Sequence, residues 1–212
     1  MCQPDRHGPN EGRAGPSARV LDAAIPPTDA INAAPALDLS RAKAGTVVTG
    51  NVFYDDRVPL SVNVTYNLDD SNSFDNSALA PSDPQPSEFN GIIVAGCSTI
   101  DGNLSWTPSK APLVIGDPIS ACSYLNVAGA GHLTLGANTV MKFFQGGVLN
   151  VDTGGAVTAP STAAFTSIRD DSRCGDTNAC GGSLMPNATD WVGVKIDGAC
   201  QTWSNIYYAT CQ

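Results

Sequence analysis

The side chains with the clearest capacity for chemistry lie in one glycine-rich stretch near the end of the sequence. Four oxygen-bearing residues fall close together there: Asp170, Asp171, Asp176 and Asn178. Carboxylate and amide oxygens, completed by backbone carbonyls, form the ligand shell that Ca²⁺ prefers in proteins. The set therefore predicts a calcium site, and the alternative is an acidic, turn-forming loop that faces solvent.

Cysteine is the second reactive residue type. The seven cysteines lie at positions 2, 97, 122, 174, 180, 200 and 211, without the C-x-x-C or Cys/His spacing of a zinc site. Disulfides are favoured over scattered reduced thiols, which indicates an oxidising compartment. The sequence thus predicts an extracellular or cell-surface location.

Three disulfides are predicted: Cys174 with Cys180, Cys97 with Cys122, and Cys200 with Cys211. The first pair closes a small ring, which would stabilise the acidic stretch by roughly 2 kcal/mol in the chain-entropy model. The members of the second pair are separated by about one longer coil of a stacked β-fold. The third pair consists of the remaining two cysteines, with Cys2 left over. Other connectivities stay open, because pairing cannot be deduced from sequence.

Short strands are the elements that must position these residues. Between His132 and Asp171, three strand-like segments start at His132, Val148 and Phe165, which is a nearly constant step, and glycine occupies almost every junction. A fixed step of strand-sized segments with glycine corners is the signature of a solenoid of stacked β-coils. The 21 glycines and 15 prolines also favour strands and turns over helices.

Composition divides the chain into three predicted regions. Residues 1–45 are rich in Ala, Pro and Gly, which is typical of an extended or disordered arm. Residues 46–95 contain a predicted pair of strands, 46–54 and 60–68, followed by a polar loop. This pair would pack on the solenoid or on a neighbouring molecule. Residues 96–212 would form the solenoid itself.

Several motifs occur in a recognisable order along the solenoid region. A tryptophan strand, an apolar strand ending in Gly-Asp, an L-T-L strand and a V-x-K-F segment lie at residues 103–107, 112–117, 133–135 and 139–143. This order resembles the opening coils of secreted bacterial right-handed parallel β-helix proteins of the surface or structural type, and the resemblance extends to about residue 200. It implies an all-β fold, a right-handed parallel β-helix with an N-terminal extended arm and a short β-strand pair. Similar modules occur in adhesins, structural proteins and carbohydrate-handling proteins, so the fold alone does not give the function.

The resemblance also raises polysaccharide degradation. β-Helix pectinases combine clustered aspartates with a Gly-His pair and a basic motif. Here Gly131-His132 precedes Asp170 and Asp171, whereas the histidine motif follows the aspartates in pectinases, and no Arg-x-Lys motif comes afterwards. A lyase would have to use a nearby basic residue from the set Arg169, Arg173 and Lys195. We therefore assign no catalytic residue and expect no enzyme, with a glycosidase or polysaccharide lyase as the alternative.

A carbohydrate-binding module is the other alternative. Its site would be a groove along the solenoid flank lined by Trp191, Trp203, Tyr207 and Tyr208. Aromatic side chains of this kind offer large, flat contact surfaces. The same four residues fit the core or an end cap equally well.

Charge and the end of the sequence bear on partners. The formal net charge of −9 argues against nucleic acid, because phosphate binding needs clustered Lys and Arg. No apolar run reaches the ~18 residues of a membrane span. The last strand-like segment, Trp203 to Tyr208, has no evident cap after it, so the terminal coil would be open. An open coil predicts either a piece of a longer β-helix or head-to-tail self-assembly into an extracellular structural filament.

Overall fold

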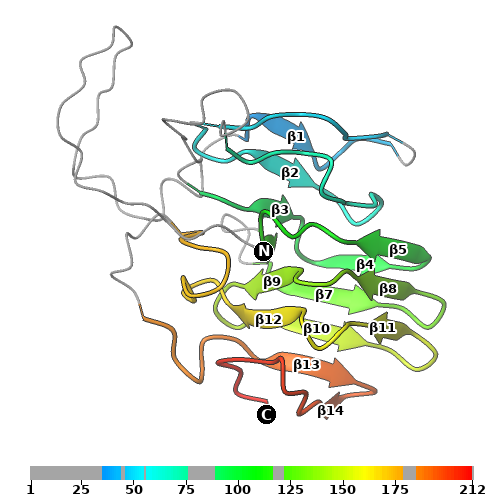
Figure 1. Ribbon diagram of the computed structural model, residues 1–212. Helices are drawn as coiled ribbons and strands as arrows, with labels where there is room; N and C mark the ends of the chain where they lie inside the picture. Colours follow the sequence, from blue (N-terminus) through cyan, green and yellow to red (C-terminus); the bar gives the residue numbers. More distant parts are fainter. Residues whose placement is uncertain are drawn as a thin grey trace, which may run out of the picture.

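The computed structural model describes residues 35–43, 46–54, 56–75, 89–116, 122–178 and 185–211 (Figure 1). All helical or strand structure in these ranges is β, as predicted, and runs from β1 (Leu37–Leu39) to β14 (Ala199–Cys200). This part of the chain contains no helix with the length and apolar character needed to cross a membrane. Figure 1 shows the strands stacked from β1 at one end to β13 and β14 at the other.

The strands form three sheets. The six-stranded sheet has the order β1, β2 (Leu60–Val62), β3 (Ile92–Val94), β6 (Leu113–Ile115), β9 (Val140–Phe143) and β12 (Ala164–Ser167). The five-stranded sheet has the order β4 (Ser98–Ile100), β7 (Tyr124–Val127), β10 (Val148–Val151), β13 (Gly193–Ile196) and β14, and its β13–β14 pair is antiparallel. The three-stranded sheet has the order β5 (Asn103–Trp106), β8 (His132–Leu135) and β11 (Ala156–Thr158). The other pairs are parallel, and from β3 to β13 each strand enters a different sheet from the strand before it, so the chain winds as a β-solenoid of about four turns.

One turn of the solenoid, which begins at β7, β8 and β9, has the same length in all three sheets. Asn126 and Asn150, which are paired on adjacent turns, are separated by 24 positions in the sequence. Val140 with Ala164 and His132 with Ala156 are paired at the same separation. The strand-like segments that start near His132, Val148 and Phe165 therefore lie in three different sheets. The spacing between these segments is therefore not the length of one coil. It covers only two of the three sheets that make up a complete turn.

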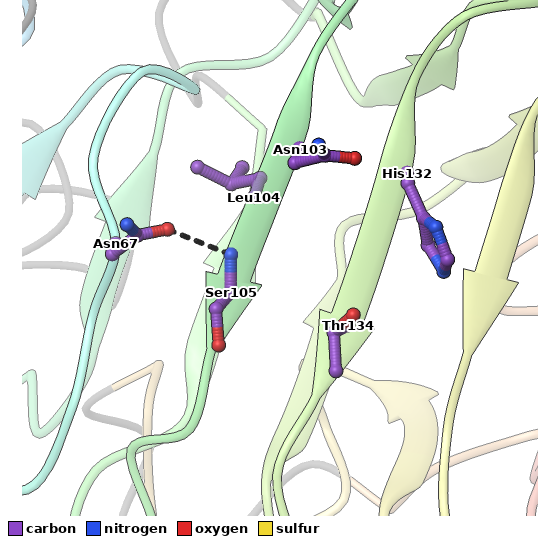
Figure 2. A pocket seen from close by; sticks show the side chains of 6 residues that line it. All are labelled: Asn67, Asn103, Leu104, Ser105, His132 and Thr134. Carbon is purple, nitrogen blue, oxygen red and sulfur yellow. Dashed lines mark hydrogen bonds between the residues drawn. The ribbon is translucent and has the colours of Figure 1, made fainter.

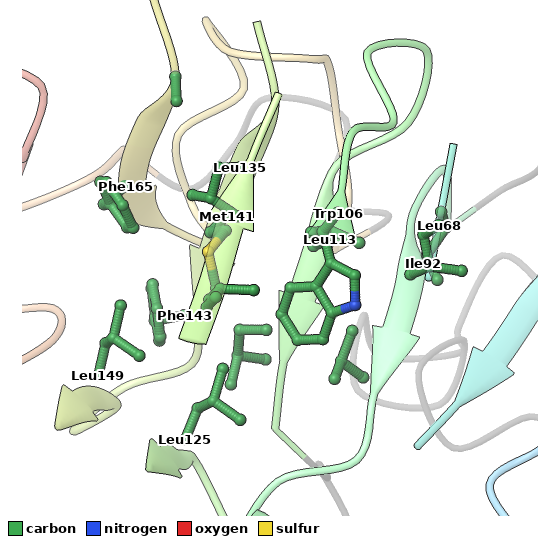
Figure 3. Packing of buried hydrophobic residues seen from close by; sticks show 14 of the residues in the cluster. Leu68, Ile92, Trp106, Leu113, Leu125, Leu135, Met141, Phe143, Leu149 and Phe165 are labelled. Atoms are coloured by element: carbon green, nitrogen blue, oxygen red, sulfur yellow. The ribbon is translucent and has the colours of Figure 1, made fainter. Parts of the chain in front are cut away.

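Apolar side chains stack on the inner face of each sheet. In the six-stranded sheet Leu113, Met141 and Phe165 lie in register on successive turns, and all three are fully buried. Burying one such side chain contributes roughly 1.5–3 kcal/mol. Trp106 lies within this core (Figure 3). Its Nε1 donates a hydrogen bond to the carbonyl of Tyr66 at 2.9 Å. The parallel register thus turns a one-dimensional pattern into a continuous core.

Close stacking of the turns explains the glycine corners. A Cβ added at Gly131 would lie 2.2 Å from the carbonyl oxygen of Ile100 in the preceding turn. No side chain fits at that distance without separating the two turns.

The N-terminal part of the described structure differs from the prediction. The strands predicted over 46–54 and 60–68 do not pair with each other. Instead β2 pairs in parallel with β1 and β3, so β1, β2 and β3 belong to the solenoid. The prediction of a separate strand pair within residues 46–95 is therefore wrong. Residues 46–54 contribute a single bridge, from Val52 to Ser73. Of the predicted arm, residues 1–34 and 44–45 lie outside the described residues.

Candidate functional site

One corner of the solenoid carries a long insertion. Val148 of β10 pairs with Gly193 of β13, whereas the 24-residue step from β7 to β10 would bring Val148 to a partner near position 172. The additional length forms an excursion, residues 168–190, of which 179–184 lie outside the described residues. The excursion contains the four residues that the sequence predicts as calcium ligands.

The excursion packs on the outer face of the six-stranded sheet. The Nζ amine of Lys142 in β9 donates to the carbonyl of Gly175 at 2.7 Å, and Thr177 Oγ1 donates to the carbonyl of Ile168 at 3.3 Å. The side chain of Lys142 is 0% exposed. All four residues of β9 are buried, so this strand is covered on both faces.

Asp170 organises the start of the excursion. Its carboxylate accepts hydrogen bonds from Thr166 Oγ1 at 2.7 Å and from Ser172 Oγ, and Arg173 Nε lies 3.2 Å from its Oδ2. The guanidinium of Arg173 lies over the ring of Tyr207, with Cζ 3.5 Å from the ring centroid. This cation–π contact links the excursion to the end of the chain.

The predicted calcium ligands lie in one segment, but protein groups already engage them. Asp170, Asp176 and Asn178 are buried, Asp171 is partly buried, and Asp176 Oδ1 accepts a hydrogen bond from the backbone N–H of Asn178 at 3.0 Å. Within the described ranges, no three His, Cys, Asp or Glu residues form a group that could hold a metal ion. A Ca²⁺ ion would have to compete with Arg173 for Asp170. Calcium binding therefore stays a prediction.

Asp190 fixes the base of the excursion, a role that the sequence did not suggest. Its Oδ2 accepts hydrogen bonds from Ser167 Oγ at 2.7 Å and from the Asn187 backbone N–H at 3.1 Å. Its Oδ1 lies 3.2 Å from Arg169 Nη1. The sequence signals for this buried polar network are faint: Lys142 interrupts an otherwise apolar strand, and Asp190 directly precedes a tryptophan.

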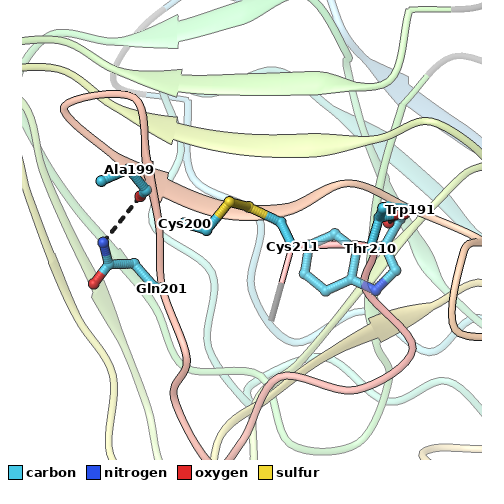
Figure 4. The surroundings of a disulfide bond; sticks show 6 residues. All are labelled: Trp191, Ala199, Cys200, Gln201, Thr210 and Cys211. Atoms are coloured by element: carbon cyan, nitrogen blue, oxygen red, sulfur yellow. Dashed lines mark hydrogen bonds between the residues drawn. A yellow bond between two sulfur atoms is a disulfide. The ribbon is translucent and has the colours of Figure 1, made fainter.

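Two of the predicted disulfides are present. Cys97 bonds to Cys122, with a Cα–Cα distance of 5.3 Å, and joins adjacent turns beside the five-stranded sheet. Cys200 bonds to Cys211, with a Cα–Cα distance of 5.4 Å (Figure 4). Cys174 is also disulfide-bonded, and its predicted partner, Cys180, lies outside the described residues.

The prediction of an open terminal coil is wrong for two of the three sheets. Residues 199–211 form a C-terminal cap that folds back across the last turn. The cap closes the six-stranded sheet, where the Phe165 N–H donates to the carbonyl of Asn205 at 3.0 Å. It also closes the five-stranded sheet, where β14 pairs with β13 and the Cys211 N–H donates to the carbonyl of Val192 at 2.8 Å. The sequence did not predict the cap because its contacts are one two-residue strand pair, isolated bridges and turns, none of which repeats along the chain.

The four aromatic residues do not form the predicted carbohydrate groove. Trp191 is 0% exposed, stacks on Phe143 with ring centroids 4.4 Å apart, and donates from Nε1 to the carbonyl of Tyr207 at 2.8 Å. Trp203 packs on Phe165 with centroids 5.8 Å apart. Tyr207 and Tyr208 are partly buried, and Tyr207 lies under Arg173. A groove that needs the ring of Trp191 is therefore excluded, and these residues serve the core and the cap.

The outer face of the three-stranded sheet is polar and open. A shallow pocket of about 230 Å³ lies there, lined by Asn67, Asn103, Leu104, Ser105, His132 and Thr134 (Figure 2). Asn67 Oδ1 accepts a hydrogen bond from the Ser105 N–H at 2.7 Å, and His132 Nε2 lies 3.1 Å from Thr158 Oγ1. The alternation of the strand sequences NLSW and HLTL is the signal that could have found this face, since every second residue is exposed.

Taken together, the three sheets, the regular turn and the cap define the protein as a β-solenoid. Comparison with known protein families, curated proteins and solved structures finds no match for this chain. The resemblance to secreted bacterial β-helix proteins therefore rests on its motifs alone.

Proposed function

We propose that this protein is an extracellular structural protein, a disulfide-stapled β-solenoid that acts as a rigid scaffold. The observation that supports this proposal is the presence of two disulfide bonds between strands or segments of the solenoid. The bond between Cys97 and Cys122 ties one turn to the next. The bond between Cys200 and Cys211 closes the cap, whose strand β14 pairs with β13. Disulfides of this kind persist in oxidising compartments and are rare in the cytosol.

The buried polar groups support a structural role rather than catalysis. Lys142, Asp170 and Asp190 hold the excursion to the sheet through hydrogen bonds and ion pairs. Catalytic acids and bases act on groups that reach them from a pocket, and these three residues are at most 4% exposed. We therefore propose no enzymatic activity.

Self-assembly enters the proposal in a narrower form. The C-terminal cap occupies the end of the six-stranded and five-stranded sheets. In the three-stranded sheet, β11 is an edge strand of the described structure. A neighbouring copy that continued the stack would therefore add to β11, because an edge strand can accept another strand through backbone hydrogen bonds.

The extracellular scaffold is tested on protein taken from its natural source. We expect Cys97, Cys122, Cys200 and Cys211 to resist alkylation unless the protein is first reduced, and immunogold label to decorate the outside of intact cells. Full alkylation of these cysteines without reductant, or label confined to the cytosol, would refute the proposal.

Electron microscopy of the purified protein tests self-assembly separately. Fibres with a regular axial repeat support addition at β11. Monodisperse single particles at every concentration contradict that part of the proposal and leave the scaffold itself in place.

Calcium at the excursion is a separable proposal that rests on Asp170, Asp171, Asp176 and Asn178. A ligand that binds only the folded state raises its stability. Addition of about 1 mM Ca²⁺ should then raise Tm, and a chelator should reverse the change. Equal Tm values with Ca²⁺ and with chelator would contradict calcium binding.

A further inference from the structure

The outer face of the three-stranded sheet carries side chains in two ranks, and all of them except Ala156 are polar. Parallel register aligns Asn103 with His132 and Ala156, and it aligns Ser105 with Thr134 and Thr158. Neighbouring strands in a sheet lie about 4.8 Å apart, so each rank repeats at that interval along the solenoid axis. Figure 2 shows Asn103 and Ser105 on one strand beside His132 and Thr134 on the next.

The polar groups of this face are available to a ligand. In the described part of the chain, the side chains of Asn103, Ser105 and Thr134 make no hydrogen bond to other protein groups. All three are exposed, as is His132. Their amide and hydroxyl groups can each donate and accept hydrogen bonds.

The chemistry of the face narrows the class of ligand. The large hydrophobic residues exposed among the described residues are Val47, Val52, Tyr54, Tyr124 and Met185, and none of them lies in β5, β8 or β11. The face therefore lacks the apolar anchors on which protein partners depend. The residues around the pocket include no Lys or Arg and the chain has a net charge of −9, so a polyanion is also disfavoured.

We propose that this face binds an uncharged, linear polysaccharide through hydrogen bonds from Ser105, Thr134, Asn103 and His132 to its hydroxyl groups. The pocket is shallow, so a single sugar ring buries little surface there. A polymer overcomes this because several rings engage successive positions of the ranks, and linked contacts add affinity. The inference goes beyond the scaffold function and does not depend on it.

Affinity electrophoresis of the full-length, oxidised protein tests the proposal. Native gels would contain hydroxyethylcellulose, glucomannan, arabinoxylan or dextran as uncharged probes, and polygalacturonate as an anionic probe. We expect at least one uncharged polymer to retard the protein. The double variant Ser105→Ala/Thr134→Val should weaken this retardation about 25-fold, since each of the two lost hydrogen bonds costs roughly fivefold in affinity.

The matched control is Thr99→Val on the outer face of the five-stranded sheet. Thr99 is an exposed strand threonine like Thr134, so its replacement should leave retardation unchanged within about twofold. Circular dichroism would confirm that each variant folds. Retardation by no uncharged polymer, retardation by polygalacturonate alone, or equal losses in the double variant and the Thr99 control would each overturn the proposal.

NMR provides a second readout at His132. Addition of a hexasaccharide of the polymer that retards the protein should shift the His132 imidazole signals. Unchanged His132 signals at saturating hexasaccharide would contradict binding at this face.

Discussion

Two outer faces of the same solenoid carry polar side chains at equivalent strand positions, and these side chains are exposed on the three-stranded sheet but buried on β9 and β12 of the six-stranded sheet. On the six-stranded sheet, Lys142 and Thr166 point outward in register and are completely buried under the excursion. On the three-stranded sheet, Ser105 and Thr134 point outward in register and are exposed. The apolar–polar alternation along a strand therefore predicts which side chains face the core. It does not predict whether the opposite side of the strand is exposed to solvent or covered by another segment.

The same polar group should therefore contribute to the free energy of unfolding where it is buried under the excursion, and contribute little where it is exposed on the three-stranded sheet. A buried polar group loses its water and must recover hydrogen bonds from the protein, whereas an exposed one exchanges partners with solvent at little cost. Matched substitutions on the two faces can break or sharpen this comparison.

The largest effect is expected at Lys142. Lys142→Ala removes the donor to the buried carbonyl of Gly175 and leaves a cavity under the excursion, which should lower the free energy of unfolding by about 2–4 kcal/mol. Lys110→Ala is the control, because Lys110 Nζ also donates to a carbonyl, that of Asp70 at 2.9 Å, but is exposed. Its cost should stay within about 0.5 kcal/mol. Urea unfolding of both variants gives the comparison, and similar losses would contradict it.

The next effect is expected at Asp190. Asp190→Ala leaves Ser167 Oγ and the Asn187 N–H without their acceptor and should cost about 2–3 kcal/mol. Limited proteolysis should then cut within the excursion earlier than in the wild type. Asp101→Ala removes an exposed carboxylate and should change neither stability nor the cleavage pattern. An unchanged cleavage rate in the Asp190 variant would show that other contacts hold the excursion.

A threonine pair provides the closest match between the two faces. Thr166→Val removes the hydroxyl that donates to Asp170 at 2.7 Å and should cost about 1–2 kcal/mol. Thr134→Val keeps the same shape on the exposed face and should change stability by less than about 0.5 kcal/mol. Thermal unfolding of the two variants is the measurement. A Thr134 variant that lost as much as the Thr166 variant would place the two faces in the same environment.

The smallest effect belongs to exposed carboxylates in turns. Hydrogen bonds from the Ser71 hydroxyl, then from its backbone N–H, lower the pKa of Asp69 below its ordinary value of 3.8. A lowered folded-state pKa means that the stabilisation is complete above 3.8 and is lost as pH falls through the folded value. Ser71→Ala should therefore be slightly less stable than the wild type at pH 7, and the difference should shrink in acid. A difference that grows below about pH 3 would have the wrong sign.

The sequence predicted the stack because inside and outside alternate along every strand. The run from Leu60 to Leu68 illustrates the strength and the limit of this signal. Leu60, Val62, Tyr66 and Leu68 are buried as their alternation predicts. The chain nevertheless turns at Val64 and Thr65, so Leu60 lies in the six-stranded sheet while Leu68 bridges Trp106 in the three-stranded sheet. Local periodicity reports the direction of a side chain and not the identity of its neighbour.

The site residues were harder to predict for a related reason. Cysteine spacing of about one turn predicted the bond between Cys97 and Cys122, and the bond between Cys200 and Cys211 was predicted as the pair that remained. Lys142 and Asp190 are buried because the excursion packs on the sheet. The contacts that hold it there join residues far apart in the sequence: Lys142 and Gly175 are 33 positions apart, and Ser167 and Asp190 are 23 positions apart. The cap depends on single bridges such as the one between Phe165 and Ile206. Contacts made once leave no repeat in the sequence from which they could be inferred.

The excursion also says something about how such a molecule can change over time. It nearly doubles the length of one turn at a single corner, while Val148 to Val151 keep their register with the next strand of the sheet. Corners can thus acquire new segments independently of the strands, whereas an insertion within a strand would turn every following side chain to the wrong side. The corner at Gly102, where an added side chain would meet open space, is a natural point for grafting a foreign peptide. In this architecture the number of residues at a corner can therefore change without changing the register of the strands in the sheets.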